Sequence, residues 1–147
     1  MLVALGLILL GACTPPGVGQ AGSSSTPAAS EPVTHDKMAQ PVPTPGGFPT
    51  DVPVYPGARL TAGANFQSSG ESTFGMEWET LDSIAKVHTF YATKLNQGDW
   101  TISFTGATAT NFTAVFSRTS NSRETGIVGA DGITGITKIS LSLVLPA

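Results

Sequence analysis

Charged residues are scarce in this chain. Of its 147 residues only 12% are Asp, Glu, Lys or Arg, and the formal net charge is -3. A protein of this composition has no basic surface with which to hold nucleic acid, or to reach anionic lipid by charge alone. We therefore expect no nucleic-acid partner.

Cysteine is nearly absent too, and histidine is rare. A single Cys excludes an intrachain disulfide and a metal cluster of several cysteines. The two histidines are His35 and His88. The sequence shows no zinc-protease helix, nucleophile elbow, phosphate-binding loop or dinucleotide fingerprint. We expect neither a metal nor a cofactor, and no hydrolytic machinery is visible.

The first third of the chain has no aromatic residue, since all seven Phe, both Trp and both Tyr lie at or after Phe48. Residues 14–47 instead hold seven of the 11 prolines, together with Ser, Gly and Ala. Such a segment cannot bury enough apolar area to offset its chain entropy. The composition predicts a disordered tether over residues 14–47, in which His35 and Met38 are solvated linker residues.

One uncharged apolar run, residues 2–10, stands near the beginning of the sequence. It is too short to span a bilayer as a helix, which takes about 20 residues. It does have the length of a signal-peptide core. The basic residues that normally precede such a core would lie upstream of Met1.

The four residues that follow this run, Leu10-Gly11-Ala12-Cys13, resemble the lipobox of bacterial lipoproteins: a branched apolar residue, two small residues and a Cys. The resemblance implies a diacylglycerol thioether on Cys13, cleavage between Ala12 and Cys13, and an acyl chain such as palmitate on the new amino terminus. Two or three chains anchor a protein stably where one would not. The alternative is an ordinary secretory peptide in which Cys13 is incidental.

These features divide the chain into three parts. They are a lipoprotein signal peptide (1–12), a lipidated Cys with a disordered tether (13–47) and one folded domain (48–147). About 100 residues are enough for a domain to fold without disulfides. We expect an extracytoplasmic protein, held at the cell membrane by the lipid on Cys13.

Short alternating strands and one helix are predicted from residue 48 onward. Residues 48–58 are too rich in proline for a central strand, and should run along the surface with Val54 and Tyr55 packing inward. The alternation of apolar and polar residues predicts strands at residues 59–66, 72–80, 100–105, 111–118, 125–128 and 136–145.

The helix is predicted over residues 83–97. Asp82 is suited to its N-cap, and Gly98 to its left-handed stop. Apolar residues recur at helical spacing and form one stripe along it. This stripe consists of Ile84, Val87, His88, Phe90, Tyr91 and Leu95.

The order of elements predicts an α+β domain of two layers, in which the amphipathic helix covers one face of an antiparallel sheet of four to six strands. The run Tyr55-Pro56-Gly57-Ala58 ahead of a strand, with Gly98 and Trp100 after the helix, resembles a recurrent type of small lipoprotein domain in bacteria. This resemblance implies the architecture and no activity.

Few residues are candidates for chemistry in the folded part. Glu77 and Glu79 share a strand face, about 7 Å apart, which is the order of distance in a two-carboxylate site. Alternate glutamates on a solvated face are nevertheless the commoner arrangement. His88 is expected to pack at the edge of the helix stripe rather than to serve as a ligand or base.

Three glycines recur at three-residue spacing around Asp131, namely Gly129, Gly132 and Gly135. A phosphate or calcium loop would need more than one acidic residue or a lysine. We therefore expect a flexible hairpin connection there, beginning at Gly129.

The sequence as a whole predicts a lipid-anchored, non-catalytic module that binds an envelope protein or a small ligand. The alternative is a small envelope enzyme that uses Glu77, Glu79 or His88 in a groove between helix and sheet. No pattern in the sequence identifies the ligand.

Overall fold

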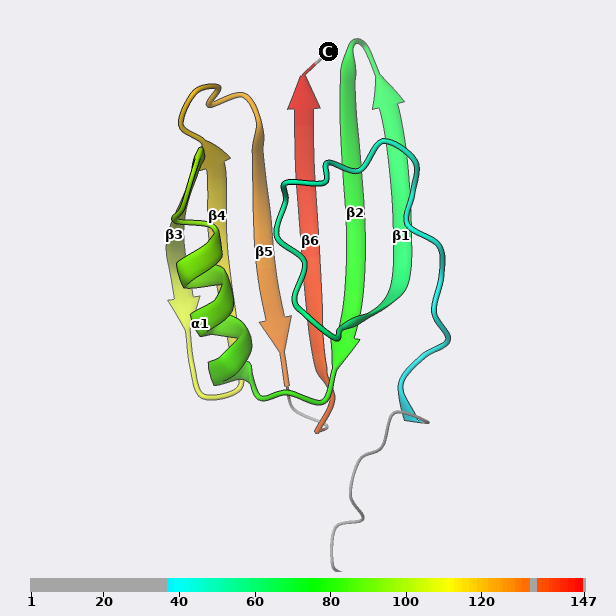
Figure 1. Ribbon diagram of the computed structural model, residues 1–147, viewed down its shortest axis with the longest axis vertical. Coiled ribbons are helices and arrows are strands. Elements are labelled where there is room, and N and C mark those ends of the chain that lie inside the picture. Colours follow the sequence, from blue (N-terminus) through cyan, green and yellow to red (C-terminus); the bar gives the residue numbers. More distant parts are fainter. Residues whose placement is uncertain (1–36, 133–134, 147) are drawn as a thin grey trace, which may run out of the picture. The chain divides into compact units, whose positions relative to one another are not determined.

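The computed structural model describes residues 37–132 and 135–146. The strands are β1 (Arg59–Ser68), β2 (Glu71–Thr80), β3 (Trp100–Ala107), β4 (Asn111–Arg118), β5 (Thr125–Asp131) and β6 (Thr137–Pro146), and the helix α1 is Ile84–Lys94. All neighbouring strands are antiparallel, in the order β1-β2-β6-β5-β4-β3 (Figure 1). The predicted antiparallel sheet with one helix on one face is confirmed.

Strand alternation decides which face of the sheet becomes the core. In β6, Ile139, Leu141 and Leu143 are buried, whereas the intervening Ser140 and Ser142 are exposed. Successive side chains of a strand point to opposite faces, so one face of the sheet is apolar and must be covered. Between β1 and β2 the chain turns at Ser69 and Gly70, both with positive φ, as in tight two-residue hairpins.

The helix covers the half of this apolar face formed by β3, β4 and β5 (Figure 1). The predicted stripe is confirmed, because Val87, Tyr91 and Leu95 are fully buried. The predicted ends are wrong by one to three residues. The N-cap is Ser83 rather than Asp82, since the Asp82 carboxylate accepts hydrogen bonds from Lys86 and Tyr55 instead.

At its other end, the helix stops at Lys94 and not at residue 97. The last turn tightens there, because the N–H of Asn96 bonds to the carbonyl of Thr93, three residues back, rather than four. Gly98 has the positive φ expected of it, but lies beyond this turn.

The other half of the apolar face is covered by residues 38–58, here named the strap, which crosses in front of β6 and β2 in Figure 1. The ring of Phe48 packs against Phe74, with centroids 5.6 Å apart. Val52 and Tyr55 are buried, while Val54 is 40% exposed. The expectation for Tyr55 is confirmed and that for Val54 is wrong, because Val52 is the valine that points inward.

The folded part begins before residue 48. Met38 is only 3% exposed, the N–H of Val42 bonds to the carbonyl of Leu60, and Pro45 lies directly against Gly63. The prediction of a solvated linker residue is therefore wrong for Met38, and Val42 and Pro45, within the predicted tether, contact the sheet. Residues 1–36, which include Ala12, Cys13 and His35, lie outside the described residues.

Strand β5 is longer than predicted. Gly129 pairs with Thr113 on one side and with Ser140 on the other, and Asp131 pairs with Asn111 and Lys138. The hairpin connection expected from Gly129 therefore starts only after Asp131, because the ladders on both sides hold this segment in the sheet. The described domain is mainly sheet, with strands of seven to ten residues against one helix of 11.

Candidate functional site

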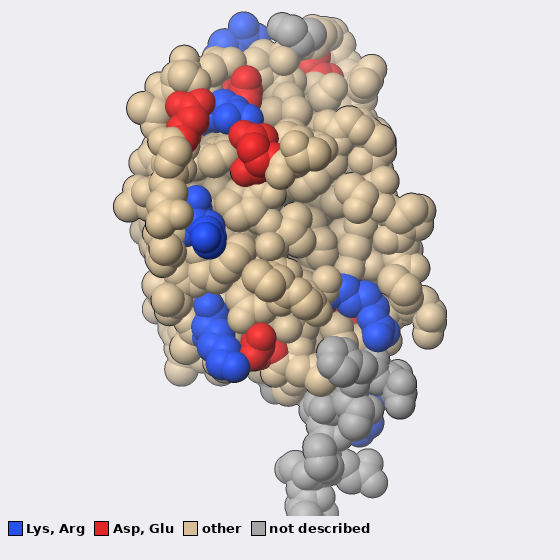
Figure 2. Space-filling model, viewed as in Figure 1, with Lys and Arg blue, Asp and Glu red and all other residues tan. Residues whose placement is uncertain are grey.

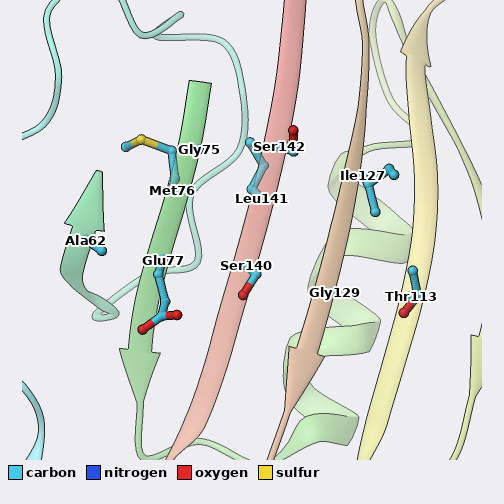
Figure 3. Close-up of a pocket in the computed structure, with 10 residues that line it drawn as sticks. All are labelled: Ala62, Gly75, Met76, Glu77, Thr113, Ile127, Gly129, Ser140, Leu141 and Ser142. Atoms are coloured by element: carbon cyan, nitrogen blue, oxygen red, sulfur yellow. The ribbon is translucent and has the colours of Figure 1, made fainter. Parts of the chain in front are cut away.

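The face of the sheet opposite α1 is exposed over most of its area, and we name it the open face. Figure 3 looks onto it, with the helix behind the sheet. Along the middle of β1, β2 and β6 its residues are small and exposed, namely Ala62, Ala64, Gly75, Ser140 and Ser142. Near the end of β1, Phe66 is 69% exposed on the same face. Its β4 and β5 side carries bulkier residues.

A hollow of about 480 Å³ lies over these small residues. Its lining residues, drawn in Figure 3, are Ala62, Gly75, Met76, Glu77, Thr113, Ile127, Gly129, Ser140, Leu141 and Ser142. Because most of them carry short side chains, the sheet surface is low here, and the hollow can accept a side chain from a binding partner.

Val115 and Ile127 stand beside this hollow and form an apolar ridge. They are directly opposite each other on β4 and β5, and are 40% and 51% exposed. A second hollow, of about 260 Å³, adjoins the same ridge and is also bordered by Ser142. An exposed apolar ridge between two hollows is a surface shaped to interlock with another one.

One end of the open face is charged. The ammonium group of Lys138 lies 3.3 Å from Glu77 Oε1 and 3.6 Å from Glu79 Oε1. The hydrogen bond with Glu77 and the attraction of both carboxylates raise the pKa of Lys138 above its ordinary value. The two glutamates predicted to share a face therefore do so, with a lysine held between them.

Glu79 is almost completely buried, at 4% exposure. Its Oε2 accepts a hydrogen bond of 2.7 Å from the backbone N–H of Ala39. Arg59 donates a hydrogen bond of 3.2 Å to the carbonyl oxygen of Ala39. These contacts hold the beginning of the strap against the open face. The Glu79 side chain is therefore buried and already hydrogen-bonded to the strap.

His88 lies away from these glutamates, on the helix and therefore on the other side of the sheet. Its ring is 4.2 Å from that of Phe104 and 5.3 Å from that of Phe112, measured between centroids. It packs as an aromatic side chain, as predicted. The structure brings Glu77 and Glu79 together, but not His88 with either of them.

Arg118 is a residue that the sequence analysis missed. Its guanidinium group contacts Asp51 at 2.6 Å, Asp99 at 3.5 Å and Glu124, and lies 4.3 Å above the ring of Trp100. Figure 2 shows a basic group among acidic ones at the end of the molecule where β4 ends. Its partners come from the strap, the start of β3 and the β4–β5 turn, and no sequence pattern links these positions.

In residues 37–132 and 135–146, no three His, Cys, Asp or Glu side chains gather closely enough to hold a metal ion. The helical part of the same residues includes no segment long and apolar enough to cross a membrane.

Comparisons with protein-family models, with curated proteins and with solved structures give no match for this chain. The open face combines an apolar ridge with two hollows, and its charged end is tied to the strap.

Proposed function

We propose that the protein is a lipid-anchored lipoprotein of the cell envelope, and that its folded domain is a non-catalytic binding module. The observation that supports the binding role is the open face, where Val115 and Ile127 are exposed beside a hollow of about 480 Å³. Contiguous exposed apolar surface costs free energy in water, and on soluble domains it marks interaction sites. The partner is an envelope protein or a small ligand.

We also assign the domain to the two-layer α+β class. The sheet is one layer, and α1 together with the strap makes the other. The helix and the strap together cover only the apolar face of the sheet, so the opposite face is free to bind.

The anchor is proposed from Leu10-Gly11-Ala12-Cys13, with the lipid on Cys13 holding the protein at the extracytoplasmic side of the membrane. Metabolic labelling of cells with a fatty acid tests it. The wild type should carry label and Cys13→Ala should not, with Cys13→Ser as a second unlabelled variant. An unlabelled wild type would overturn the proposed localisation.

The second candidate is a small envelope enzyme that uses Glu77, Glu79 or His88. Against it stand the burial of Glu79 under the strap, the shared Lys138 contact, and the aromatic packing of His88 on the other side of the sheet. We expect Glu77→Gln, Glu79→Gln and His88→Ala each to keep the cellular phenotype. Loss of the phenotype in a variant that still folds would favour the enzyme instead.

The binding role is tested by photo-crosslinking in intact cells. A photo-reactive amino acid is placed at position 127 of the full-length chain, and in the control at position 89, where Thr89 is exposed on the helix. We expect a discrete adduct from position 127 and none from position 89. The absence of any adduct from position 127 would contradict a binding role for the open face.

A further inference from the structure

We propose that the partner of the open face is a second copy of this chain, packed face to face about a two-fold axis parallel to the strands. The inference rests on the proposed function, since it names the occupant of the surface described there. A symmetric dimer uses the same patch on both copies, so that patch must be complementary to itself.

An axis parallel to the strands, lying between the two sheets, reverses the order of the strands in the second copy. With the order β1-β2-β6-β5-β4-β3, β2 then lies over the partner's β4, and β6 over its β5. Strand directions remain nearly aligned, as they are in packed β-sandwiches.

Strand register fixes which residues would meet. One unbroken row across the open face consists of Ala64, Gly75, Ser142, Ile127, Val115 and Ser103. In this row the small residues lie on β1, β2 and β6, and the bulky ones on β5 and β4. The axis therefore places Val115 opposite the partner's Gly75, and Ile127 opposite the partner's Ser142, so that each ridge enters a hollow.

A second row, at the charged end, gives independent support. It consists of Arg59, Glu79, Lys138, Asp131 and Asn111. The same axis places Lys138 opposite the partner's Asp131, twice in the dimer. Opposite charges therefore meet across this interface. A two-fold axis perpendicular to the strands would instead lay each strand over its own copy, so that the ridge of Val115 and Ile127 would face the same ridge of the partner.

The area of the open face is also close to the area that a stable dimer buries on each partner. Five inter-strand spacings of about 4.8 Å and about eight residues at about 3.3 Å give a flat area on the order of 600 Å². The ridge and hollows make the accessible area larger than this projection. Stable interfaces bury about 800 Å² on each partner.

The test uses the full-length chain in cells, with the photo-reactive residue at position 127 and two copies that carry different epitope tags. We expect an adduct of doubled mass that contains both tags. Gly75→Leu fills the hollow, and its new side chain meets open space within its own chain, since no atom lies within 4 Å of the added Cβ. It should reduce the adduct about tenfold.

Gly46→Leu is the matched control, because its Cβ also meets open space, but Gly46 lies in the strap on the other side of the sheet. It should leave the adduct unchanged. Val115→Ser is the second blocking variant: it removes half of the ridge without adding volume, and should also weaken the adduct.

Three outcomes separate the two proposals. A two-tag adduct that Gly75→Leu and Val115→Ser both reduce supports the dimer. An adduct with a different protein or ligand overturns the dimer but leaves the proposed binding role standing. No adduct at all overturns both.

Discussion

The carboxylate of Glu79 accepts a hydrogen bond from the backbone N–H of Ala39, 2.7 Å away and 40 residues earlier in the sequence. This contact joins the strap to the open face of the sheet, although most of the strap covers the opposite face. Glu79 therefore helps to hold the first residues of the strap against the sheet.

Replacing Glu79 tests this role. Glu79→Ala removes the charged acceptor of the Ala39 N–H and leaves Lys138 with one carboxylate instead of two, so we expect a loss of about 1–3 kcal/mol in the free energy of unfolding. Glu77→Ala is the control, because its side chain is 36% exposed, and an exposed ion pair contributes at most about 1 kcal/mol. Urea unfolding measures both, and equal losses would contradict the assigned role.

Arg118 should resist replacement by lysine. Arg118→Lys keeps the charge, but loses the planar group that contacts Asp51, Asp99 and Glu124 and stacks on Trp100. We expect a loss of about 1–2 kcal/mol in the free energy of unfolding. The control, Arg123→Lys, concerns a side chain that is 71% exposed, and should change the stability by less than about 0.5 kcal/mol. If the control loses as much, the contacts of Arg118 are not responsible.

The strands and the helix stripe could be predicted because each depends on local periodicity. In β6, the alternation of Ile139, Leu141 and Leu143 with serines is visible in the sequence and reappears as burial. Periodicity fails in the strap, where prolines interrupt it: Val52 is buried and Val54 is exposed. The burial of Met38 likewise depends on a surface that only the folded sheet provides.

The candidate site, too, could be predicted from the sequence only in part. Glu77 and Glu79 could be placed on one face from their spacing alone. The self-complementary row of Gly75 and Val115 could not, because it depends on strand order, and β6 lies between β2 and β5 although β3 and β4 precede it in the chain. Non-local pairing of this kind leaves no periodic signal in one sequence.

Asp82 should make the stability of the domain depend on pH in the acid range. Its hydrogen bonds with Lys86 and with the hydroxyl of Tyr55 hold the pKa of Asp82 below its ordinary value of 3.8. A carboxyl group whose pKa is lowered by folding stabilises the protein above its unfolded pKa, and this stabilisation is lost as the pH falls through the folded pKa. The effect is small, because the side chain is 37% exposed.

Asp82→Asn should therefore flatten the fall in unfolding midpoint between about pH 5 and pH 2. The hydrogen bond from Thr137 to the backbone carbonyl of residue 82 remains in this variant, so the local fold should persist. Tyr55→Phe removes one of the two bonds to the carboxylate, and should give an intermediate slope. An unchanged slope in Asp82→Asn would show that other carboxylates dominate the acid transition.

Gly126 should tolerate no side chain, even though it lies within a strand. A Cβ at this position would overlap the ring of Phe116 and the carbonyl oxygen of Ser142. The ring is fully buried, and the carbonyl belongs to the neighbouring strand, so neither can move freely. Gly126→Ala should lower the free energy of unfolding by about 1–3 kcal/mol, as other overpacked cores do.

The matched control is Gly106→Ala in β3, where an added Cβ meets nothing within 4 Å. Alanine restricts the unfolded chain more than glycine does, so this variant should be neutral or more stable by up to about 1 kcal/mol. Thermal and urea unfolding of the two variants should move in opposite directions. If both lose stability equally, the general cost of altering a strand glycine explains the result, and the close approach of Phe116 to β5 does not constrain the sheet.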